Sequence, residues 1–306
     1  MPRTRYRDQY DSHRKVVLSS CLFYCLILET MQITKTTDAA SKPSLVMLVY
    51  GNGGVGKTTF GSTAPKPLLV DCENGAKYFG LRGIEMDVAK ISKWEDIQGL
   101  HEIARSGDYE TIIIDPIGEL MEKLKVYMVS LKNPKNVMPD GSPTMAGWGW
   151  LKDAMKSMLK QLRDTGVNIL LVAHVEEKDV EGTLVKRPKI LTKISEDLIA
   201  FVDVVGYMQA VTVNEDNQPV TKRIIRVQPS ETYEAKDRTN QLGAIIPPNF
   251  SEIIEATSGT KTFKWSKNAE AAPKKEEKNE ETTPSKKDGM KDKLNAAAKK
   301  GAKSKK

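Results

Sequence analysis

Short apolar runs alternate with stretches of helical spacing along the middle of this chain. Runs rich in Ile, Leu and Val predict buried strands at residues 45–50, 67–70, 111–114, 168–173, 202–213 and 223–228. Such near-continuous apolar content is typical of strands that are covered on both faces. Apolar positions at helical spacing predict a helix from about Trp148 to Arg163, just before the fourth run. The alternation predicts an α/β fold with a mostly parallel sheet flanked by helices.

The two ends of the chain differ in composition from this middle part. The formal net charge is +7, but residues 267–306 hold 13 Lys against 7 Asp and Glu, and residues 1–30 contribute a further +2. The rest of the chain is therefore close to neutral, and the basic pI does not by itself indicate a nucleic-acid-binding surface on the folded part. We predict an extension over residues 1–43, a folded domain over 44–265 and a disordered C-terminal tail over 266–306.

The first 30 residues carry a basic stretch followed by an apolar run, Val16–Leu28. At 13 residues the run is too short to cross a bilayer, so we expect no membrane partner. It resembles the apolar region of a signal peptide, although no clear cleavage site follows. We favour a non-native extension from an upstream start codon, with Met31 as the natural start, over secretion. The low cysteine content suggests a reducing compartment, and we expect a cytoplasmic protein.

A glycine-rich segment directly follows the first predicted strand. Its sequence, GNGGVGKT, matches the phosphate-loop pattern G-x-x-x-x-G-K-[ST] at every position. The glycines allow successive backbone N–H groups to surround phosphate oxygens, Lys57 reaches the β- and γ-phosphates, and the Thr58 hydroxyl ligates Mg²⁺. The alternative, a plain glycine-rich turn, does not account for the complete motif. We predict that ATP and Mg²⁺ are bound by Gly51, Asn52, Gly53, Gly54, Val55, Gly56, Lys57, Thr58 and Thr59.

Polar residues end three other predicted strands. Asp115 follows a run of isoleucines, at the strand end where ligands bind in open α/β sheets, and we predict that it joins Thr58 in holding Mg²⁺. ATP hydrolysis also needs a group that orients and deprotonates the attacking water. Glu73 and His174 are the candidates, and each could instead be an ordinary polar residue at the end of a strand.

The order of these motifs resembles the RecA/RadA-type recombinase ATPase core. More narrowly, it is similar to the phage-encoded RecA-like P-loop ATPases of the AAA type that act in single-strand annealing or recombination. The resemblance covers roughly residues 44–256. It implies that Glu73 activates the water, that His174 senses the γ-phosphate, and that Lys236 and Arg238, in a K-x-R pattern, act as catalytic cations at the ATP of the adjacent subunit.

The resemblance also implies partners. These are single-stranded DNA that stimulates hydrolysis, other copies of the chain in a ring or filament, and a single-strand-binding protein. The segments 130–150 and 176–194 occupy the positions of the DNA-contacting loops, although the well-defined loops of the recombinases are not recognisable. They offer Lys132, Lys135, Trp148, Trp150, Lys178, Lys186, Arg187, Lys189 and Lys193. The tryptophans could instead belong to the core, and the second segment could be a solvated hairpin.

Four other functions are the alternatives to this resemblance. A partitioning-type ATPase normally has lysine at the second position of the phosphate loop, where this chain has Asn52. A replication or packaging accessory ATPase without strand annealing is a further alternative. A small-molecule kinase would need an arginine-rich lid and an acceptor site, neither of which is recognisable. A non-enzymatic binding module does not explain why Lys57, Thr58, Glu73 and Asp115 are all present.

Overall fold

The computed structural model describes residues 44–215 and 218–260, without the side chains of Thr192 and Lys193. The predicted extension with its apolar run and the predicted C-terminal tail lie outside these ranges. Their expected character, and the domain boundaries that depend on it, stay predictions.

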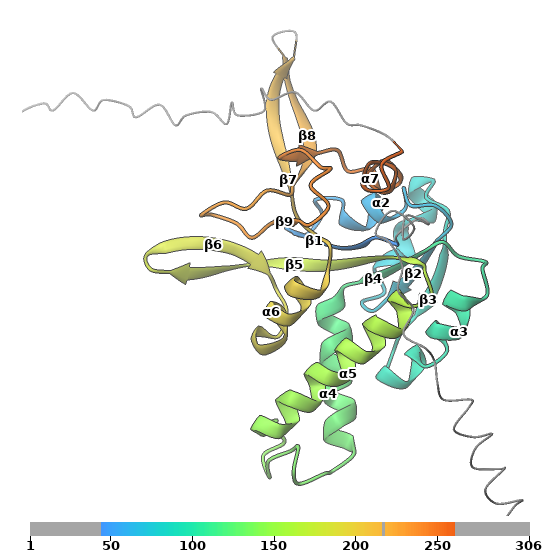
Figure 1. Cartoon of the computed structure of the whole chain (residues 1–306), viewed down its shortest axis with the longest axis vertical. Coiled ribbons are helices and arrows are strands. Elements are labelled where there is room, and N and C mark those ends of the chain that lie inside the picture. The colour runs from blue at the N-terminus through green and yellow to red at the C-terminus, as the bar shows by residue number, and fades with distance from the viewer. Residues whose placement is uncertain (1–43, 216–217, 261–306) are drawn as a thin grey trace, which may run out of the picture. The chain divides into compact units, whose positions relative to one another are not determined.

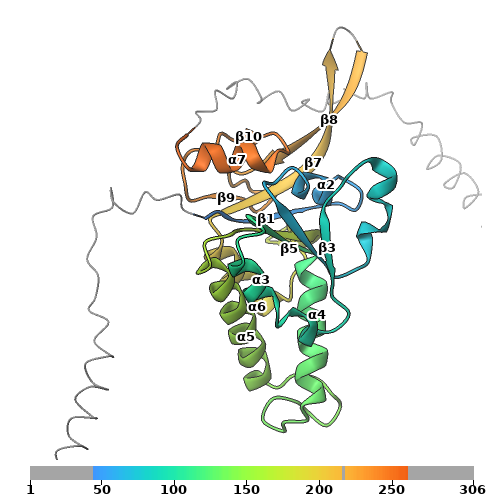
Figure 2. The same cartoon turned by 90° about the vertical axis from the view of Figure 1, so that its right-hand side faces the viewer.

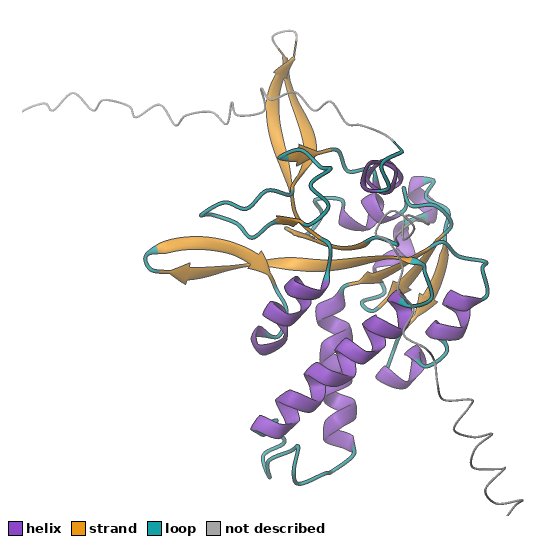
Figure 3. Ribbon diagram, in the orientation of Figure 1, coloured by secondary structure: helices purple, strands orange, loops and turns teal. Residues whose placement is uncertain are grey.

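The described residues form a mixed sheet with helices on both faces (Figure 1; Figure 3). The strands follow the order β10-β8-β7-β1-β5-β4-β2-β3, while β6 pairs with β5 and β9 with β7. All neighbours from β7 to β3 are parallel, and the pairings of β8, β10, β6 and β9 are antiparallel. The strand bounds are β1 Val46–Gly51, β2 Pro67–Asp71, β3 Asp87–Lys90, β4 Thr111–Asp115, β5 Asn168–Val180, β6 Thr183–Pro188, β7 Val204–Glu215, β8 Gln218–Arg226, β9 Lys236–Asp237 and β10 Ile245–Ile246.

Alternate residues of the central strands point into two separate apolar layers. In β1, Leu48 and Tyr50 join the layer covered by α3, α4, α5 and α6, whereas Met47 and Val49 join the layer covered by α2 and α7. Figure 2 shows these two groups of helices on opposite faces of the sheet. The helix bounds are α2 Lys57–Gly61, α3 Leu100–Arg105, α4 Ile117–Ser130, α5 Met145–Arg163, α6 Thr192–Phe201 and α7 Phe250–Thr257, with 3₁₀ turns η1 Gly75–Tyr78, η2 Gly80–Arg82 and η3 Trp94–Ile97.

The predicted fold class is confirmed, and the structure corrects the extent of several elements. The strand predicted at residues 168–173 is β5, which runs on to Val180 and pairs with β6. Strands β7 and β8 also project beyond the sheet as a hairpin (Figure 1). The extended part of β5 and the first half of β8 carry polar side chains because they leave the core, so apolar content alone does not reveal them, whereas β7 is predicted to residue 213 and ends at Glu215. The edge strand β3 was missed for the same reason, since most of its residues are exposed.

The strand order determines which residues meet at the functional edge. β5 lies between β1 and β4, and in its register with β1, His174 is opposite Gly51. The parallel strands therefore bring the phosphate loop, His174 and Asp115 to the same edge of the sheet. Among the helices of residues 44–215 and 218–260, none combines the length and apolar character needed to span a bilayer.

Candidate active site

The phosphate loop connects β1 to α2, and glycine is required at two of its positions. A Cβ atom at Gly51 would lie 2.3 Å from the backbone oxygen of Met208 on the neighbouring strand β7. Gly56, at the N-cap of α2, has a φ of 102°, a left-handed conformation that strongly favours glycine. The loop can therefore lie against β7 and lead directly into the N-terminus of α2, where free backbone N–H groups can bind phosphate.

Lys57 is a buried cation at the centre of this loop. Its side-chain ammonium donates hydrogen bonds of 2.9 Å to the backbone oxygens of Gly51 and Asn52. Burial lowers its pKa, and the nearby carboxylates of Asp115 and Glu73 oppose that shift. The ammonium is thus held within the loop, where a phosphate would compensate for its lost hydration.

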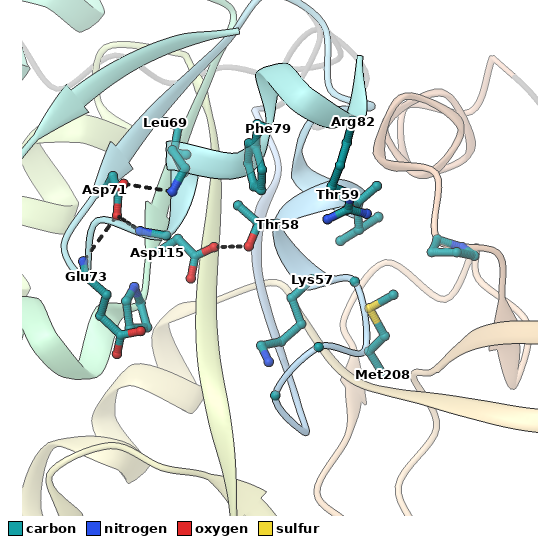
Figure 4. A pocket seen from close by; sticks show the side chains of 18 of the residues that line it. Lys57, Thr58, Thr59, Leu69, Asp71, Glu73, Phe79, Arg82, Asp115 and Met208 are labelled. Carbon is teal, nitrogen blue, oxygen red and sulfur yellow. Dashed lines mark hydrogen bonds between the residues drawn. The ribbon is translucent and has the colours of Figure 1, made fainter. Parts of the chain in front are cut away.

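Thr58 and Asp115 meet as the predicted magnesium pair. The Thr58 hydroxyl donates a 2.5 Å hydrogen bond to Asp115 Oδ2, as Figure 4 shows. Burial raises the pKa of Asp115, while the hydrogen bond from Thr58 and the charge of Lys57 oppose this shift. Within the described ranges, no cluster of three or more His, Cys, Asp or Glu side chains could hold a metal by itself. One hydroxyl and one carboxylate fit Mg²⁺, which usually takes its other ligands from nucleotide phosphates and water.

Glu73 and His174 lie together in the same pocket as this pair. His174 Nε2 is 3.3 Å from Glu73 Oε1, and both side chains are about half-exposed. The turn that carries Glu73 is held by Asp71, whose carboxylate accepts hydrogen bonds from the backbone N–H groups of Glu73, Gly75 and Ala76. The Glu73 carboxylate is therefore placed at the edge of the pocket, where a water molecule can reach it. Its catalytic role stays a prediction.

The pocket also contains residues that the motifs did not identify. Arg82 donates a 3.1 Å hydrogen bond to the Thr59 hydroxyl, and Phe79 lies nearby on the segment after β2 (Figure 4). Met208 and Arg223 reach the phosphate loop from β7 and β8. These residues are distant in sequence from the loop and follow no recognisable spacing, so only the fold reveals that they belong to the site.

Lys236 and Arg238 have partners within their own chain. The Lys236 ammonium donates hydrogen bonds to the backbone oxygens of Ile199, Ala200 and Val202, and the Arg238 guanidinium donates to that of Ala200. Both side chains thus point to one face of the extended segment, toward the C-terminus of α6, and neither lines the phosphate-loop pocket. Their role at a neighbouring subunit's ATP stays a prediction.

The segment 130–150 contains the connection between α4 and α5 and the first turns of α5, whose tryptophans take part in packing. Trp148 and Trp150 are half-buried against the core, and the Trp150 ring lies 6.4 Å from that of Tyr127. Both rings thus pack against the core with part of their surface exposed, and their contact with DNA stays a prediction. Lys132 and Lys135 belong to the connection itself, which lies at the end of the two helices remote from the sheet (Figure 1; Figure 2).

Most of the segment 176–194 is a hairpin rather than a loop, formed by the extended part of β5 and β6. Arg187 pairs with Glu234 at 2.7 Å, and the Lys186 ammonium lies 5.9 Å from the centre of the Tyr207 ring. With Lys178 and Lys189 the hairpin has four cations. Its four carboxylates balance their charge: Glu176, Glu177, Asp179 and Glu181. Residues 176–190 therefore have no net positive charge to attract DNA phosphates. The side chain of Lys193 lies outside the described part.

The family match agrees with this geometry. The AAA domain family matches residues 44–239, which is more than half of the chain. The SPbeta prophage-derived uncharacterized protein YorG of Bacillus subtilis strain 168 is 22% identical over 216 residues, covering 69% of this chain and 64% of that protein. The chain thus spans less than two thirds of this relative's length.

Among solved structures, a KaiC-like protein from the archaeon Pyrococcus horikoshii OT3 is similar over 60% of this chain and 77% of its own. The TM-score is 0.34 and the identity 13%. The family match includes the phosphate loop, Glu73, Asp115 and His174, together with the strands from β1 to β9. This chain belongs to the AAA domain family of P-loop ATPases.

Proposed function

We propose that this chain is a phage-type ATPase that binds Mg²⁺ and ATP at the edge of β1, β4 and β5, and that hydrolyses ATP during a reaction on single-stranded DNA. The contact between Thr58 and Asp115 carries the ATPase part of the proposal. It brings a hydroxyl of the phosphate loop and a strand-end carboxylate together, and the Lys57 ammonium and the Glu73–His174 pair lie in the same pocket.

The side chains divide the work of hydrolysis among them. The phosphate loop and Lys57 bind the β- and γ-phosphates, and Thr58 and Asp115 are the residues that would hold Mg²⁺. When bound, Mg²⁺ neutralises charge on the phosphate oxygens. Glu73 orients the attacking water and accepts its proton, while His174 contacts the γ-phosphate end and positions Glu73. Lys57 stabilises the negative charge that develops on the transferred phosphoryl group.

The nucleic-acid part of the proposal has different support. It draws on the motif order shared with recombinase ATPases and on the similarity to a prophage-derived protein. The neutral charge of residues 176–190 favours the alternative, an AAA-type ATPase that serves another phage process without contacting DNA through this hairpin. Hydrolysis measured with and without single-stranded DNA separates the two, because only the first predicts stimulation.

Nucleotide binding is the direct test of the ATPase site. Lys57→Ala should weaken ATP binding by about a hundredfold or more, because it removes a buried charge-assisted contact to phosphate. Lys66→Ala is a matched control, since Lys66 is exposed and pairs with Glu110 away from the pocket. Equal ATP affinity of the wild type and Lys57→Ala would contradict the proposed site.

A further inference from the structure

Arg223 reaches the phosphate loop from a strand that carries none of the expected motifs. It lies on β8, and its Cδ and Nε atoms are 3.3 Å from the position that a Cβ at Gly56 would take. Gly56 is the N-cap residue of α2, directly before Lys57. The absence of a side chain at this glycine therefore leaves space that the arginine side chain uses.

The guanidinium of Arg223 has no hydrogen bond or ion pair within residues 44–215 and 218–260. The other cations of the pocket are engaged, since Lys57 donates to two backbone oxygens and Arg82 donates to Thr59. An arginine beside a helix N-terminus is electrostatically unfavourable unless an anion lies between them. The pocket thus holds one cation, Arg223, to which residues 44–215 and 218–260 supply no ion-pair partner.

Strand geometry explains why this particular residue faces the loop. In the register of β7 and β8, Ala210 is opposite Arg223 and Val211 is opposite Lys222. Side chains alternate between the two faces of a strand, so Lys222 lies on the other face. There it pairs with Glu215 at the end of β7. Lys222, the neighbour of Arg223 along β8, is therefore an exposed cation like Arg223, but its side chain points to the opposite face.

We propose that Arg223 binds the polyphosphate of the nucleotide held in its own chain, from the side of the pocket formed by β8. The planar guanidinium presents several donors to phosphate oxygens, which a lysine at this place would not match. The nucleotide would then lie between the N-terminus of α2 and the base of the β7–β8 hairpin. This inference rests on the proposed function, and it differs from the Lys236 and Arg238 prediction because the contact lies within one chain.

The affinity for ADP and ATP tests this contact. Arg223→Ala should raise the Kd for both nucleotides about tenfold or more, the scale of a hydrogen bond to a charged group, and Arg223→Lys should recover only part of the loss. Lys222→Ala removes the same charge from the opposite face and should bind both nucleotides like the wild type. Thermal unfolding without nucleotide should give the same Tm for Arg223→Ala and Lys222→Ala, since both side chains are exposed.

Hydrogen exchange supplies a second readout. ADP should protect the backbone amides of residues 208–213 and 220–226 in the wild type and in Lys222→Ala, and this protection should be lost in Arg223→Ala. If Arg223→Ala binds both nucleotides as tightly as Lys222→Ala, the inference is wrong while the ATP site stands. If the wild type binds neither nucleotide, the proposed function fails and this inference fails with it.

Discussion

Asp115 and Lys57 illustrate how the ATP site is built at the expense of stability. Burial raises the pKa of the Asp115 carboxyl and lowers that of the Lys57 ammonium, so each charged form is less favourable in the folded chain than in water. Neighbouring charges compensate for only part of this loss. A bound metal and phosphate would supply the remaining compensation, which couples ligand binding to folding.

Replacing Asp115 with asparagine separates stability from binding. Without nucleotide, Asp115→Asn should raise the free energy of unfolding at pH 7 by about 1 kcal/mol, because a buried charge is removed while Thr58 keeps an acceptor. The gain should shrink as pH falls through the raised pKa of the folded state, and it should vanish below the unfolded pKa of about 3.9, where Asp115 is neutral in both states. Urea unfolding at several pH values measures this. A lower free energy of unfolding for Asp115→Asn at pH 7 would contradict this prediction. In the same variant, Mg²⁺ should no longer strengthen ATP binding.

At the residue scale, sequence patterns revealed only those members of the site that lie in continuous motifs or end apolar strands. Lys57, Thr58 and Asp115 meet as expected because the motif sets the local backbone and parallel strands end at one edge. Arg82 and Arg223 could not be found in this way. Their positions depend on the 3₁₀ turns after β2 and on a hairpin that projects past the core, and neither feature has a distinctive periodicity.

At the scale of elements, side chains of the segment around β9 cap the C-terminus of α6. The Lys236 ammonium and the Arg238 guanidinium satisfy backbone oxygens that have no partner within the helix, and Asp203 pairs with Arg238 at 3.4 Å. The negative end of the helix dipole stabilises two cations that would otherwise repel each other. The K-x-R pattern therefore has a structural reason that does not depend on a second subunit.

Stability measurements test this capping role. Lys236→Met keeps much of the side chain's apolar length but removes the ammonium, and it should lower the free energy of unfolding by about 1–2 kcal/mol. Lys222→Met serves as the control, because Lys222 lies on an exposed hairpin and pairs there with Glu215. Equal urea midpoints for the two variants would show that the contacts to α6 contribute little.

A mixing experiment tests the predicted role of Arg238 across subunits. Arg238→Ala and Lys57→Ala should each hydrolyse ATP poorly, and a mixture should recover activity if an intact arginine can complete a neighbour's intact phosphate loop. Such a head-to-tail contact builds a ring or filament instead of a two-fold dimer. No recovery at any mixing ratio would leave Arg238 with its capping role alone.

For the whole molecule, the distribution of charge determines how DNA could be bound. The C-terminal residues 267–306 carry net +6, whereas the hairpin over residues 176–190 is neutral. A chain that ends at Trp265 should still bind single-stranded DNA when ATP is present, but with a weaker dependence on salt because fewer phosphate contacts release counterions. Binding at several salt concentrations measures this. Complete loss of binding would assign the DNA contact to the C-terminal residues.

Glu73 is the proposed catalytic carboxylate of ATP hydrolysis in this chain. The most direct measurement is phosphate release from ATP in a single turnover by the wild type, Glu73→Gln and Glu119→Gln. Glu119 is a suitable control, since it lies in the first turn of α4, outside the phosphate-loop pocket but near it. We expect Glu73→Gln to bind ATP normally and release phosphate about a hundredfold more slowly, with Glu119→Gln close to wild type. Release at the wild-type rate by Glu73→Gln would contradict the account.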